Sequence, residues 1–180
     1  MILFLTYGLR LSELQQLNIS SFNFTREEFK IYRKRGKEST MPLNKSVTKV
    51  IIDYINNERR TDDVLEPSHK DALFLSLQGK RMTQRQIRDL VKKYTSIALK
   101  TSRSAGYSPH KLRATAATSL IGRGNSIYDV AALLDHEQVT TTQLYAKHRA
   151  NVKRNLVSGM EWEEERLDVN SKEAQKESED

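Results

Sequence analysis

Residues 108–113 read Ser-Pro-His-Lys-Leu-Arg, and this stretch predicts the start of a helix with a polar face. Ser108 is a favoured N-cap, and Pro109 fits the first helical turn, where its missing N–H is not needed. His110 and Arg113 are three residues apart, so they share one face of that helix. Free N–H groups and the positive end of the helix dipole favour an anion there. The stretch therefore either binds a phosphate or carries two solvated side chains.

Further helices are expected on the C-terminal side. The helix that starts at Pro109 should end near Gly122 and Gly124, and Ser126 should cap another that runs to about Leu134. Apolar spacing predicts two more helices, over residues 139–147 and 151–157.

The N-terminal side changes pattern twice. Residues 1–18 have helical spacing, whereas short alternating runs between Phe22 and Leu43 predict two or three antiparallel strands with Gly36 at a turn. An apolar stripe from Val47 to Ile55 and a second pattern over residues 83–99 predict helices. Four side chains of the latter should face inward: Ile87, Leu90, Val91 and Tyr94. The predicted fold is mostly α with a small antiparallel β-sheet, an α+β fold.

Charge is unevenly distributed along the 180 residues. The last 20 residues hold nine acidic and three basic side chains, a net charge of −6. Because the whole chain has a net charge of +7, residues 1–160 have a net charge of +13. We predict one domain over residues 1–160 and a mobile acidic tail over 161–180. A domain this basic is expected to bind a polyanion, although a merely soluble basic domain remains the alternative.

Several classes of protein are disfavoured by composition. The chain has no cysteine, no apolar stretch near the roughly 20 residues of a membrane span, and no signal-peptide pattern at its start. We therefore expect a cytoplasmic protein without a membrane partner. Its four histidines have no carboxylates at ligand spacing, and it has no Gly-rich phosphate loop, so neither a metal nor a nucleotide cofactor is predicted.

Three other stretches contain candidate functional residues, each with a simpler explanation. Arg10 sits among apolar neighbours, where it must extend to solvent or meet an anion. The basic turn of residues 33–37 can be a solvated hairpin tip. His136 can cap a helix, and Tyr145 can belong to the core. The stretches are Tyr7-Gly-Leu-Arg10-Leu-Ser-Glu-Leu14, Arg33-Lys-Arg-Gly-Lys37 and Leu133-Leu-Asp-His136-Glu-Gln-Val-Thr-Thr-Thr-Gln-Leu-Tyr145.

Taken together, the four stretches resemble the catalytic domain of the tyrosine recombinase (phage integrase) family. Gly-Leu-Arg-Leu-Ser-Glu-Leu, a lysine-bearing hairpin, Pro-His-x-Leu-Arg, and a histidine nine residues before a tyrosine occur in that order. Thr-Thr-Gln-Leu-Tyr145 matches the Thr-Thr-x-x-Tyr pattern of the family. The resemblance covers about residues 1–150 and implies a site-specific recombinase, an enzyme that needs neither metal nor ATP.

The resemblance implies a role for each matching residue. Tyr145 would attack a DNA phosphate and form a 3′-phosphotyrosyl bond, while Arg10 and Arg113 would hold the non-bridging oxygens. His110 would act as general base, and His136 would donate a hydrogen bond to the phosphate.

A lysine of the hairpin would protonate the leaving 5′-oxygen. Alignment of Pro42-Leu43 with the Pro-Leu that follows the turn in the family favours Lys34, with Lys37 as the alternative.

The sequence also departs from the family pattern. Asp135 replaces the glycine that usually precedes the second histidine, Ala114 stands where a histidine is frequent, and Tyr7 stands where threonine is common. The family's N-terminal DNA-clamping domain is not recognisable, so we expect weak, salt-sensitive DNA binding.

The implied partners are double-stranded DNA and other copies of the chain, in a homo-tetramer on DNA in the full-length form, although this chain alone can be monomeric. The apolar stripe Val152, Leu156 and Met160 suits docking on a neighbouring copy, or packing on its own domain. A type IB topoisomerase, and a DNA-binding protein of the same fold without catalysis, are the competing functions. The candidate DNA contacts are Arg33, Arg35, Lys37, Arg81, Arg85 and Arg88.

Overall fold

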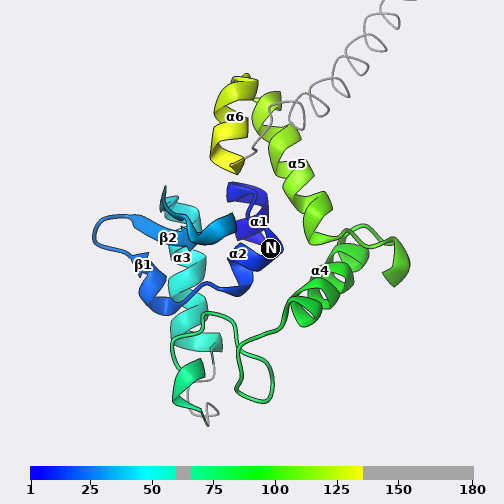
Figure 1. Cartoon of the computed structure of the whole chain (residues 1–180). Helices are drawn as coiled ribbons and strands as arrows, with labels where there is room; N and C mark the ends of the chain where they lie inside the picture. The colour runs from blue at the N-terminus through cyan, green and yellow to red at the C-terminus, as the bar shows by residue number, and fades with distance from the viewer. Residues whose placement is uncertain (60–65, 136–180) are drawn as a thin grey trace, which may run out of the picture. The chain divides into compact units, whose positions relative to one another are not determined.

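The computed structural model describes residues 1–59 and 66–135, and this part of the chain is rich in helices with one small sheet (Figure 1). The chain forms two compact units, Met1–Ala116 and a second that begins at Ala117. The predicted fold, mostly α with a small antiparallel sheet, is confirmed. Its helices are α1 (Ile2–Tyr7), α2 (Leu11–Gln15), α3 (Lys45–Asp53), α4 (Gln84–Ala98), α5 (Pro109–Gly122) and α6 (Ile127–Leu134).

The helical pattern of residues 1–18 forms two short helices rather than one. Gly8 adopts a left-handed conformation with φ of 60°, and its N–H donates to the Phe4 carbonyl at 2.9 Å, so α1 ends there. Glycine makes this conformation cheap because it has no Cβ. The chain then restarts as α2, with Arg10 at its N-cap. The break places Arg10 at a helix start instead of within a helix.

The three strands β1 (Phe22–Asn23), β2 (Glu28–Tyr32) and β3 (Glu38–Pro42) form an antiparallel sheet in chain order. Phe29 pairs with Met41 across β2 and β3, and both side chains are buried, whereas the neighbouring Lys30 faces solvent. This alternation is the period-2 pattern of a sheet with one buried face. The predicted turn at Gly36, with φ of 72°, is confirmed.

The core of the first unit includes aromatic contacts between the helices and the sheet. Tyr7 meets Phe29 edge-on, with ring centroids 4.9 Å apart. The Tyr7 hydroxyl oxygen accepts a hydrogen bond from the N–H of Asn44 at 2.8 Å, which places the N-cap residue of α3. The last turn of this helical segment, Tyr54–Glu58, is a π-helix.

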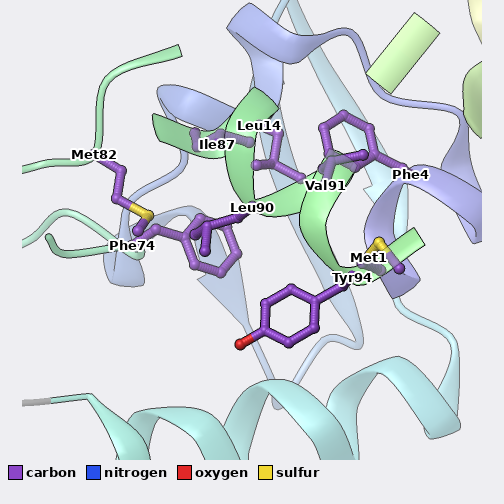
Figure 2. Close-up of a pocket in the computed structure, with 9 residues that line it drawn as sticks. All are labelled: Met1, Phe4, Leu14, Phe74, Met82, Ile87, Leu90, Val91 and Tyr94. Atoms are coloured by element: carbon purple, nitrogen blue, oxygen red, sulfur yellow. The ribbon is translucent and has the colours of Figure 1, made fainter. Parts of the chain in front are cut away.

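Thr83 is the N-cap of α4, and its hydroxyl accepts a hydrogen bond from the Gln86 N–H. The helix buries Ile87 and Val91 as predicted. Tyr94 was predicted to face inward, but it is 52% exposed, so this prediction was wrong. It lies at the edge of an apolar pocket of about 230 Å³ formed with side chains such as Phe4 and Leu14 (Figure 2). The apolar face of α4 is therefore wider than the part of it that neighbouring segments cover.

The connection from α4 to α5 is closely packed. Thr95 Oγ1 accepts a hydrogen bond from the Tyr107 N–H at 2.8 Å. A Cβ on Gly106 would lie 2.3 Å from the Lys92 carbonyl oxygen, so only glycine fits there. These contacts hold the chain immediately before Ser108, whose hydroxyl accepts from the Lys111 N–H at 3.2 Å at the start of α5. The helix predicted from Pro109 to about Gly122 is confirmed.

The second unit has a small apolar core in its described residues. Ala117, Val130 and Leu134 are buried together, with the half-buried Leu120 and Ile121 packed against them. Ser126 caps α6, as predicted, by accepting from the Tyr128 N–H at 3.2 Å. Residues 139–147, 151–157 and 161–180, for which helices or a tail were predicted, lie outside the described residues.

None of the helices in the described ranges is long and apolar enough to cross a membrane.

Candidate functional site

A cavity of about 240 Å³ in the first unit gathers side chains from three separate segments of the chain. Arg10 comes from the start of α2, Arg88 from α4, and His110 and Arg113 from the first turns of α5. Leu9, Leu11, Ser108 and Pro109 complete its wall. The cavity therefore brings Arg10 together with His110 and Arg113, about 100 positions later in the chain. These three residues were predicted as one set.

Arg113 is held in place by the end of α1. Its guanidinium is buried, and Nη1 donates to the Gly8 carbonyl at 2.5 Å. The short hydrogen bond joins two segments 105 residues apart and fixes the guanidinium at the cavity wall. An arginine fixed in this way can bind an anion without first losing side-chain entropy.

Arg10 is held by Glu13 within the same helix. The backbone N–H of Arg10 donates to Glu13 Oε2 at 2.7 Å, and Nη1 donates to Oε1 at 2.8 Å. The Glu13 side chain is only 1% exposed, whereas that of Arg10 is 30% exposed and reaches the cavity. Glu13 is not among the residues predicted for the site, although its i, i+3 spacing from Arg10 was a usable signal.

Arg33 approaches the same buried carboxylate from the sheet. Its side chain is 5% exposed, with Nη1 4.0 Å from Glu13 Oε1 and Nη2 3.6 Å from Met41 Sδ. A buried carboxylate needs opposite charge nearby, and Arg10 and Arg33 both supply it. Arg33 therefore has almost no exposed surface, and its contact with DNA stays a prediction.

Lys34, Arg35 and Lys37 are exposed in the turn between β2 and β3. Lys34 does not line the cavity, but it follows Arg33 directly in the chain. The turn is closed by the Arg33 N–H donating to the Lys37 carbonyl at 2.7 Å. Its base is thus connected through Arg33 and Glu13 to Arg10.

The candidate DNA contacts on and before α4 differ from one another. Arg81 Nη1 donates to the carbonyls of Gln15 and Leu17, each at 3.0 Å, and Nη2 contacts Asn18 Oδ1. Burial lowers the pKa of Arg81. This arginine connects two parts of the fold, whereas Arg85 and Arg88 are exposed on α4.

His110 is exposed at the cavity, in the first turn of α5. His136 and Tyr145 lie outside the described residues. A fixed pair of guanidiniums beside an imidazole and a helix start can bind a phosphate and accept a proton next to it.

The model of the phage integrase family matches residues 1–151. The chain belongs to this family. The match contains all four stretches that suggested it, including the cavity residues of the first unit.

Curated relatives include tyrosine recombinase XerD of Staphylococcus haemolyticus, 35% identical over 77% of this chain and 45% of its own length. Tyrosine recombinase XerC of Chlamydia trachomatis is 32% identical over 86% of this chain and 47% of its own length. The chain thus spans about half the length of the curated relatives that it matches.

Among solved structures, the XerH site-specific recombinase bound to a palindromic difH substrate, a post-cleavage complex, has a TM-score of 0.69 at 21% identity. The match covers 87% of this chain and 43% of that one. It shows that the two share a fold.

Proposed function

We propose that this chain is the catalytic part of a site-specific DNA recombinase, which cuts and rejoins strands through a covalent bond to Tyr145. The observation that carries the proposal is the cavity that gathers Arg10, His110 and Arg113, with both guanidiniums held by fixed partners. The names of the relatives support the same activity.

In the proposed cleavage step, Tyr145 Oη attacks the phosphorus and its proton passes to His110. The bond from phosphorus to the 5′-oxygen breaks, and Lys34 donates a proton to that oxygen, which leaves a 5′-hydroxyl. Arg10 and Arg113, with His136, stabilise the charge on the non-bridging oxygens as the transition state forms.

The reverse reaction rejoins strands without an external energy source. A 5′-hydroxyl attacks the phosphotyrosine, so one phosphodiester is exchanged for another and no bond energy has to be supplied. The site residues can provide all the positive charge that this chemistry needs. A reaction independent of metal ions and nucleotides is therefore part of the proposal.

The proposed substrate is double-stranded DNA, and a XerH structure bound to its difH DNA supports this choice. We propose that residues 1–160 form the catalytic part and that the acidic residues 161–180 lie beyond it. Activity in a homo-tetramer on DNA, inside the cell, belongs to the same proposal. The exposed Arg35, Lys37 and Arg85 are its candidate contacts to the DNA backbone.

The test uses a pool of nicked duplexes with a randomised central region, in which the short cleaved fragment diffuses away and traps the adduct. The full chain is mixed with this pool in the presence of EDTA, and denaturing gels reveal any covalent protein–DNA band. We expect a band with the wild-type chain and none with Tyr145→Phe.

Tyr145→Phe removes one hydroxyl and is the matched control for the nucleophile. If the wild-type chain bound duplexes from the pool but formed no band, the proposal would be wrong and the chain would be a DNA-binding protein. A band that persists in Tyr145→Phe would also contradict it.

A further inference from the structure

The cavity contains one cation more than the family pattern names. Arg88 projects from α4 and lines the cavity with Arg10, His110 and Arg113. The resemblance assigned Arg88 no role at the reacting phosphate. Its place in the wall therefore needs its own explanation.

No protein group within the described residues neutralises Arg88: its exposed side chain makes no hydrogen bond or ion pair there. The next residue, Asp89, lines a different pocket, together with Lys93 and Arg103. Glu13 lies beside the cavity but is buried between Arg10 and Arg33. The Arg88 charge thus adds to a positive cavity, which favours an anionic ligand.

Arg88 also differs from the other two arginines in how it is held. The Glu13 carboxylate positions Arg10, and the Gly8 carbonyl positions Arg113. Arg88 has no such protein partner in the described ranges, so its ligand must order it. A contact to a phosphate that does not react can be equally strong in the bound ground state and in the transition state, and such a contact strengthens binding without raising the maximal rate.

We propose that Arg88 binds a DNA phosphate adjacent to the phosphate that Arg10 and Arg113 hold. This inference rests on the proposed function, because those two arginines already serve both non-bridging oxygens of the reacting phosphate. Arg88 then sets the position of the strand in the cavity and takes no part in bond breaking.

The first experiment compares Arg88→Gln with Lys93→Gln, which removes a charge from the same helix on the side of the other pocket. Fluorescence anisotropy follows binding of a duplex selected from the randomised pool, at several salt concentrations. We expect Arg88→Gln to weaken binding about three- to tenfold and to reduce the salt slope by about 0.9, the value for one phosphate contact. Lys93→Gln should match the wild type, and Arg88→Lys should restore the slope.

The second experiment replaces each backbone phosphate of that duplex in turn with an uncharged methylphosphonate. Neutralising one phosphate should no longer change DNA binding by Arg88→Gln, and neutralising its neighbour should no longer change binding by Arg113→Gln. Binding of Arg88→Gln equal to that of the wild type would overturn the proposal. So would indifference of both variants at the same phosphate, or a lower adduct rate of Arg88→Gln at saturating DNA.

These binding measurements do not depend on catalysis. A wild-type chain that forms no adduct, but shows the Arg88 and Arg113 effects on neighbouring phosphates, would contradict the proposed function and leave the Arg88 contact standing. Normal adduct formation with no effect of Arg88→Gln on binding would support the proposed function and contradict the Arg88 contact.

Discussion

The Nη1 atom of Arg10 lies 2.8 Å from Oε1 of Glu13, a carboxylate whose side chain is 1% exposed. This ion pair joins a group that faces the cavity to one that lies in the core. Arg33, at 4.0 Å from the same oxygen, extends the connection to the turn that carries Lys34. The Glu13 carboxylate thus positions the proposed phosphate ligand Arg10 and the base of the lysine turn.

Glu13→Gln should destabilise the fold and slow adduct formation. The change removes the negative charge between Arg10 and the buried Arg33, and breaking a buried pair in this way costs roughly 3 kcal/mol. Urea unfolding measures the loss, and Glu27→Gln, in an exposed turn, is the control. A free energy of unfolding within about 0.5 kcal/mol of the wild type would show that Glu13 does not stabilise the arginines.

Arg113→Ala should separate binding from chemistry. Loss of one preorganised donor to a developing oxyanion slows reactions about 100- to 1000-fold, whereas loss of one phosphate contact costs DNA affinity about tenfold or less. Single-turnover adduct formation and anisotropy measure the two effects. Since Arg113 is buried and bound to the Gly8 carbonyl, Arg113→Lys is included to keep the charge. Equal adduct rates in the wild type and Arg113→Ala would refute the assigned site.

Asp135→Gly should stabilise the second unit. Asp135 ends α6 with φ of 51° and ψ of 49°, a left-handed conformation in which a Cβ is strained. Glycine, which the family usually has at this position, should raise the free energy of unfolding by about 0.5–1 kcal/mol and Tm by about 1–3 °C. Thermal denaturation tests this, and Asp135→Ala, which removes the carboxylate but keeps the Cβ, should lower Tm. A higher Tm for both variants would mean that charge, and not backbone conformation, destabilises the wild type.

Tyr7→Phe should make the fold less sensitive to high pH. Burial raises the pKa of Tyr7, so the folded chain keeps its phenol proton at a pH where the unfolded chain has lost it. Stability is therefore unaffected below the unfolded pKa of about 10 and falls as pH rises above it. Urea unfolding between about pH 8 and 11 should show a shallower decline in the variant.

Two further effects enter this measurement. Tyr54 also has a pKa raised by burial, so part of the decline should remain in Tyr7→Phe. At pH 8 the variant should be about 1 kcal/mol less stable, because the Asn44 N–H loses its acceptor. A decline as steep as that of the wild type would contradict the contribution of Tyr7.

Local sequence signals predicted those parts of the fold that depend on neighbouring residues. Ser108 and Pro109 gave the start of α5, and Gly36 gave the turn of the sheet, because capping and turn preferences act within a few residues. The contacts that Arg33 and Arg81 make within the fold could not be predicted from neighbouring residues. Their partners, Glu13 and the carbonyls of Gln15 and Leu17, are 20 to 66 positions away.

The candidate site was predictable for a different reason. Arg10, His110 and Arg113 were grouped by the resemblance of their motifs to a family, and the cavity contains all three. Glu13 and Arg88 were not given these roles, since one acts from the core and the other has no counterpart in the motif. A single sequence does not show which exposed arginine faces a cavity, because helix packing decides it.

The central claim is that Tyr145 becomes covalently bound to DNA, and mass spectrometry of the trapped adduct tests it most directly. The adduct formed in EDTA is digested with nuclease and protease, and the modified peptide is sequenced. The account predicts a nucleotide joined through its 3′-phosphate to Tyr145. A nucleotide joined to any other residue, or a DNA-bound chain that never carries one, would contradict it.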